Sequence, residues 1–124
     1  MKRPAFKFRV QVEGTRFVRV TVAEDKAEMW KALEKCHGER HRHEVAACVY
    51  APNSPDHGCI ADLFFFWRCV ARPAVVAHEA THAAAAILIA LKKSFELGTD
   101  DEVMAYWVEK LTEKILARTG MAPL

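Results

Sequence analysis

The fold is decided by residues 73–93, which read PAVVAHEATHAAAAILIALKK. Pro73 suits the first position of a helix, where no hydrogen bond is lost with its missing amide hydrogen. The rest of the run is almost entirely Ala, Val, Ile and Leu, which predicts a helix buried on nearly all sides. The polar exceptions before the final Lys92 and Lys93 are His78, Glu79, Thr81 and His82. Ionisable groups in a buried helix are costly unless they hydrogen-bond or bind a ligand, so we expect this helix to carry the functional site.

Three of these polar residues form the pattern H-E-x-x-H. His78 and His82 are four positions apart, and side chains at this spacing lie on one face of a helix, about one turn from each other. Both imidazoles can therefore reach a single zinc ion, while Glu79 projects where it can polarise a metal-bound water. The alternative is a pair of buried, hydrogen-bonded histidines, because a chain with six histidines produces such a match by chance more readily than most.

A catalytic zinc needs a third protein ligand and one open position. Nineteen residues separate His82 from Glu102, which we expect in the first turn of the next helix. An antiparallel helix pair with a short loop would bring that turn back towards the middle of the first helix. Two alternatives remain open. Glu102 can instead cap its own helix by reaching back to Thr99, and Glu109 can serve as the third ligand in its place.

This pattern resembles the gluzincin class of zinc metallopeptidases, the thermolysin-like group. In that class H-E-x-x-H lies on one helix and a glutamate ligand lies near the start of the next. The resemblance covers residues 59–118, and the phrase DEVMAY at 101–106 is similar to the second motif of small phage-encoded or bacterial members. It implies a zinc (Zn2+) cofactor, a peptide or protein substrate, and these site residues: His78, His82 and Glu102 as ligands, and Glu79 as general base and acid.

Two features depart from the pattern of that class. The acidic residue expected four positions after the ligand glutamate is Tyr106 here, which we interpret as a partner that orients an imidazole, with Glu109 as the alternative. Within these 124 residues we expect no counterpart of the domain that in this class closes the cleft and supplies an oxyanion-stabilising histidine. His57, Tyr50 and Tyr106 are the candidate replacements. The sequence thus predicts metal binding more directly than peptidase activity.

The remaining periodicities predict an α+β, zincin-like fold in a single domain over 1–124. Phe6 and Phe8 begin a clean period-two alternation that is typical of a half-buried strand. We expect a hairpin over 5–22, a helix over 24–36, strands over 45–50 and 59–67, and a last helix over 100–118. The small mixed or antiparallel twisted sheet would pack on the motif helix and the glutamate helix, and the strand over 59–67 would hold the substrate backbone.

The charge distribution suggests a second class of function. The net charge is only +2, yet residues 1–44 carry eleven Lys and Arg against seven Asp and Glu. The alternative to an enzyme is a non-catalytic, zinc-stabilised binding module that contacts nucleic acid or a protein partner through Lys7, Arg9 and Arg19. Basic side chains on a hairpin are more often simply solvated, so nucleic acid is not the partner that we expect.

The four cysteines contain no C-x-x-C pair, so we expect free thiols in a reducing compartment. No segment resembles a signal peptide, and the apolar stretch over 83–91 is too short to span a bilayer. We therefore expect a cytoplasmic protein. A second zinc site can be drawn from Cys36, His37, His41, His43 and Cys48. The polar run that holds most of these residues is more typical of a surface loop.

Overall fold

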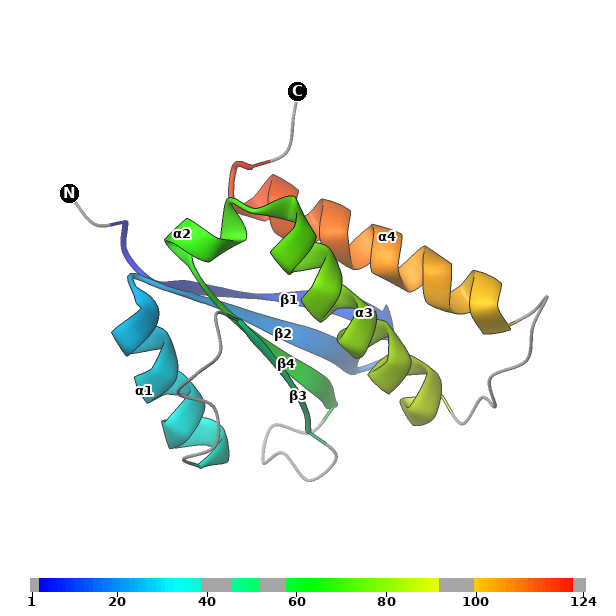
Figure 1. Cartoon of the computed structure of the whole chain (residues 1–124). Helices are drawn as coiled ribbons and strands as arrows, with labels where there is room; N and C mark the ends of the chain where they lie inside the picture. The colour runs from blue at the N-terminus through cyan, green and yellow to red at the C-terminus, as the bar shows by residue number, and fades with distance from the viewer. Residues whose placement is uncertain (1–2, 39–45, 52–57, 92–99, 122–124) are drawn as a thin grey trace.

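The computed structural model describes residues 3–38, 46–51, 58–91 and 100–121. It is an α+β structure in which one four-stranded mixed sheet has helices on both faces (Figure 1). The elements in chain order are β1 (Phe6–Glu13), β2 (Arg16–Ala23), α1 (Lys26–His37), β3 (Ala47–Tyr50), β4 (Cys59–Phe66), α2 (Trp67–Val70), α3 (Pro73–Ala90) and α4 (Asp100–Arg118). The α+β class is as predicted, and no feature of this topology identifies a zincin specifically.

The predicted hairpin is confirmed in β1 and β2. Val10 pairs with Val18 in an antiparallel ladder, and the alternating side chains put Phe8 in the core and Arg9 at the surface. Gly14 makes the turn with a φ of 56°, a backbone conformation that side chains disfavour.

The predicted first helix is confirmed as α1. The Asp25 carboxylate caps it by accepting a hydrogen bond from the backbone amide of Glu28 at 2.9 Å, and Gly38 ends it with a φ of 88°. Its buried side chains are Met29 and Leu33. The helix covers one face of the sheet, over β2 and β4.

The sheet order is β1-β2-β4-β3, with β4 parallel to β2 and antiparallel to β3. Every residue of β4 is buried, as its aromatic sequence predicts, but the strand ends at Phe66 and Trp67 already begins α2. Because β4 is hydrogen-bonded on both sides, it has no free edge. The prediction that this strand holds a substrate backbone is therefore wrong, and the edges of the described sheet belong to β1 and β3.

One carboxylate lies inside this apolar strand. Asp62 is fully buried. The Arg19 guanidinium donates to both of its oxygens, from Nε to Oδ1 at 2.5 Å and from Nη2 to Oδ2 at 2.7 Å. His37 Nε2 lies 2.9 Å from Asp62 Oδ2. The hydrogen bond to Asp62 raises the pKa of Arg19. Arg19 was expected on the solvated hairpin face with Lys7. Instead Arg19 neutralises the buried Asp62 carboxylate, so it is not part of a solvated basic face.

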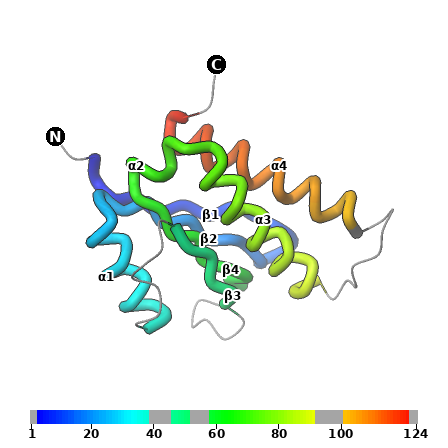
Figure 2. The backbone as a smooth tube through the Cα atoms, viewed as in Figure 1, coloured from blue at the N-terminus to red at the C-terminus, as the bar shows by residue number. Residues whose placement is uncertain are grey.

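The motif helix is less buried than its composition predicts. Figure 2 shows α3 and α4 side by side in opposite directions, and α3 also contacts β3 and β4. The polar residues His78, Thr81 and His82 are exposed, whereas Glu79 is buried. The expectation of a helix buried all round is therefore wrong, because the apolar residues of α3 also cover part of its outer surface, at Ile89 for example.

The predicted last helix is confirmed as α4. Its apolar stripe packs towards α3, with Trp107, Leu111 and Ile115 buried.

Among the described residues, α3 is the one helix whose length and composition would let it cross a membrane, and 44% of its 18 residues are buried in the structure. The core helix of a soluble protein passes the same test, and the contacts of α3 with the sheet and α4 account for its apolar composition.

The buried ion pair gives a stability prediction. We expect Arg19→Met to lower the free energy of unfolding by about 3 kcal/mol, because it leaves the Asp62 carboxylate buried without its main cation. Lys7→Met on the same hairpin is the control and should change it by less than about 0.5 kcal/mol, because Lys7 is exposed. Urea denaturation of both variants measures the difference. Equal unfolding midpoints for the two variants would show that burial of the Asp62 carboxylate does not depend on its ion pair with Arg19.

Candidate functional site

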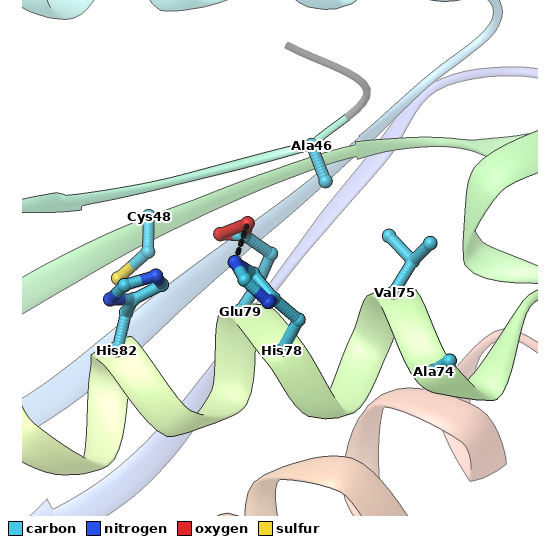
Figure 3. A pocket seen from close by; sticks show the side chains of 7 residues that line it. All are labelled: Ala46, Cys48, Ala74, Val75, His78, Glu79 and His82. Atoms are coloured by element: carbon cyan, nitrogen blue, oxygen red, sulfur yellow. Dashed lines mark ion pairs between the residues drawn. The ribbon is translucent and has the colours of Figure 1, made fainter.

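A cavity of about 630 Å³ lies between α3 and the edge strand β3 (Figure 3). It opens to solvent and holds all three chemically active residues of the H-E-x-x-H motif. The residues that line it are Ala46, Cys48, Ala74, Val75, His78, Glu79 and His82. Small and apolar side chains form one end of the cavity, and imidazole, carboxylate and thiol groups form the other.

The two histidines share one face of α3, as their spacing predicts. The ring centroids of His78 and His82 are 5.0 Å apart, and the ring planes meet at 72°. The His78 side chain is 69% exposed and His82 is also exposed. The predicted burial of both imidazoles is therefore wrong, and burial gives them no reason to bind a metal. What remains is their proximity to each other at the mouth of a cavity.

Glu79 differs from its two neighbours because it points into the protein. It is only 7% exposed, and Figure 3 shows its carboxylate directed towards the strands. Its Oε1 atom lies 3.9 Å from Nε2 of His78, which is too long for a hydrogen bond. A residue directly after His78 is rotated by about 100° around the helix, and this rotation turns Glu79 towards the sheet. The site thus combines two accessible nitrogen donors with one sheltered carboxylate.

Cys48 is a cavity residue that the sequence did not assign to this site. It lies on β3, where it pairs with Leu63, and is half-buried. Burial, together with the smaller effect of the negative charges of Glu79 and Asp62, raises the pKa of the Cys48 thiol to about 12. The thiol is therefore protonated at neutral pH. The alternation of β3 gives the face of Cys48, but only the packing of β3 beside α3 brings it to the histidines.

The expected third ligand does not lie with the histidines. Glu102 is exposed in the first turn of α4, and neither it nor Glu109 lines the cavity. Figure 3 shows the ribbon of α4 on the side of α3 away from the two imidazoles. Within the part of the chain that the structure describes, no three His, Cys, Asp or Glu side chains form a group that could hold a metal ion.

The other candidate residues are dispersed. Tyr106 is 53% exposed on α4 and its ring contacts Trp107, with ring centroids 5.3 Å apart. The structure does not place it beside an imidazole. Tyr50 is exposed at the end of β3. His57, Thr99 and two of the five residues of the alternative cysteine and histidine site, His41 and His43, fall outside the described residues.

Comparison with protein-family models, with curated proteins and with solved structures found no match. The geometry of the cavity and the chemistry of its side chains are therefore the basis for a functional assignment.

Proposed function

We propose that this chain is a zinc-dependent, metallopeptidase-like protein that binds zinc through His78 and His82 and hydrolyses peptide bonds with Glu79 as general base. The observation that carries the proposal is the arrangement around one open cavity, with two adjacent imidazoles at its mouth and a sheltered carboxylate in its wall. These are the two imidazoles and the carboxylate that the H-E-x-x-H motif contributes to such chemistry.

The donor set suits zinc. Zn–N bonds are about 2.0–2.1 Å long, so one ion can bond two imidazoles whose centroids are 5.0 Å apart. Exposed imidazoles also bind a metal at a smaller desolvation cost than buried ones. The described residues group no third protein ligand with these two donors, whereas a catalytic zinc usually has three, so water would take the third position as well as the open one.

The residues of the chain then have distinct roles. Zinc, when bound, would lower the pKa of a coordinated water and polarise the scissile carbonyl. The Glu79 carboxylate would accept the proton of the attacking water and deliver it to the leaving amine. Its burial keeps it away from bulk water, where it would be solvated and less available for the transfer.

The edge strand β3 supplies a surface for the substrate. It borders the cavity through Cys48, and its outer side has no neighbouring strand in the described sheet. An extended peptide that pairs with such an edge places its backbone parallel to the strand, next to α3. In this proposal β3 takes the role that the sequence had assigned to the strand over 59–67.

The proposal includes a cytoplasmic location, which rests on the four cysteines, all of which are free thiols.

The competing hypothesis is a zinc-stabilised module that binds through Lys7, Arg9 and Arg19. It is weakened because Arg19 forms an ion pair with Asp62.

The metal assignment predicts a loss of zinc from histidine variants. Protein purified without added zinc should contain a stoichiometric amount, and His78→Ala and His82→Ala should each lose most of it, because each removes one of two nitrogen donors. Thr81→Ala is the matched control on the same exposed face, since the Thr81 hydroxyl only donates to the Ala77 carbonyl of its own helix. Elemental analysis by mass spectrometry gives the metal content. Zinc-free wild-type protein that also fails to bind added zinc would refute the assignment.

The general-base role predicts a separation of binding from catalysis. Glu79→Gln should keep its zinc and lose about 10²–10⁴-fold in the rate of cleavage of a denatured, casein-like substrate. Glu113→Gln, an exposed change on α4, should retain the wild-type rate. A chelator should abolish cleavage by the wild type. If Glu79→Gln loses zinc to the extent of His78→Ala, Glu79 is a ligand and not the base.

The third ligand can be tested directly. Because the carboxylate of Glu102 lies outside the cavity, we expect Glu102→Gln to retain zinc to the same extent as Glu109→Gln. Metal content and zinc affinity by competition with a chromogenic chelator provide the measurement. A selective loss of affinity in Glu102→Gln would instead support the ligand set that the gluzincin resemblance implies.

A further inference from the structure

A second, chemically different groove lies at the opposite edge of the sheet, between β1 and α4. Its volume is about 240 Å³, and its lining residues are Phe8, Arg9, Val10, Gln11, Lys110, Lys114 and Arg118. Four of these seven side chains are cationic and none is acidic. Since β1 and β3 are the two edges of the sheet, this groove is separate from the cavity that holds the histidines.

The cations of α4 form a row. Lys110, Lys114 and Arg118 follow one another at intervals of four residues, so they lie along one side of the helix, about 6 Å apart along its axis. The ion pairs of the described residues involve none of these three. The carboxylates of Glu109 and Glu113 occupy other positions around α4 and do not line the groove.

Aromatic rings hold these cationic groups in place. The Arg118 guanidinium carbon lies 4.7 Å from the Phe8 ring centroid, and Lys110 Nζ lies 5.0 Å from that of Trp107. Arg9 pairs with Arg19 across the hairpin, and its guanidinium carbon lies 4.0 Å from the Phe17 ring centroid on the sheet face away from α4, so the cations that face the groove are those of α4. A guanidinium stacked on a ring keeps its N–H groups at its edge, where they match the geometry of an oxyanion.

The chemistry of the groove favours phosphate over a peptide. Like charges at four-residue spacing destabilise a helix, and a ligand that carries a row of anionic groups would remove this repulsion. The apolar lining residues Phe8 and Val10 are buried in the core, so the groove offers no apolar pocket for the side chains of a peptide. A phosphodiester backbone needs only a row of cations. The exposed ring of Tyr106, one turn before Lys110, adds a surface on which a base can stack.

We propose that the groove between β1 and α4 binds the phosphodiester backbone of single-stranded nucleic acid. Lys110, Lys114 and Arg118 contact successive phosphates, without reading the base sequence. This activity is independent of the zinc site, since it uses the other edge of the sheet and none of the residues of the α3 cavity.

Fluorescence anisotropy with labelled oligo(dT) and oligo(U) tests the proposal on the full-length protein. Binding should weaken with salt, with a slope of log K against log salt of about −2 for three phosphate contacts with a single strand. Lys114→Gln should weaken binding about fivefold at low salt and reduce the magnitude of the slope by about 0.7, because it removes one contact. Arg118→Gln should act in the same way, and His78→Ala should bind like the wild type.

Lys31→Gln is the matched control, because it removes the same charge from an exposed position on α1, where Lys31 pairs with Glu28. It should leave both affinity and slope unchanged. Lys114 is exposed on α4, so its variant is expected to fold, which circular dichroism verifies. Three results would overturn the proposal: no binding at low salt, equal weakening by Lys31→Gln and Lys114→Gln, or equally tight binding of poly-glutamate of the same charge. A difference between oligo(dT) and oligo(U) identifies which nucleic acid is preferred.

Discussion

The packing of α3 on β4 is the interaction on which the rest of the structure depends. Five residues of α3 that have no exposed surface face inward: Val76, Ala80, Ala83, Ala84 and Ile87. Four of the five have at most three side-chain carbon atoms, so the helix approaches the sheet closely and its rotation about its own axis is fixed. That rotation puts His78 and His82 at the mouth of the cavity and Glu79 in its wall. A different rotation of the same helix would bury the histidines or expose the carboxylate.

The two edges of the sheet carry side chains of different chemistry. At β3 the neighbouring helix supplies imidazoles, and the strand itself supplies a thiol that stays protonated. At β1 the neighbouring helix supplies a row of cations held against aromatic rings. The central strand β4 separates the two grooves and is stabilised by burial on both faces. It carries one charge, Asp62, which Arg19 neutralises and His37 contacts from the face that α1 covers.

Residue spacing in the H-E-x-x-H motif determines how the two histidines lie relative to each other, but it does not determine where Glu102 lies. Four-residue spacing requires His78 and His82 to share a helix face whatever the rest of the chain does, and they do. The distance between Glu102 and that face depends instead on which side of α3 the helix α4 packs. A loop between two helices permits either side, and the side chains that choose between them are spread over both helices and the sheet.

The sequence by itself determined the local elements and the pairing of the histidines. Strand alternation, the turn at Gly14, the cap at Asp25 and the proline that begins α3 each act within a few residues, so they can be read directly. Only the tertiary structure decided which of these elements meet. It exposed one side of an apolar helix, placed Cys48 in the cavity, turned Arg19 towards Asp62 and left Glu102 apart from the imidazoles. These outcomes follow from packing between segments far apart in the chain, and the free energy of such contacts is not carried by any single stretch of residues.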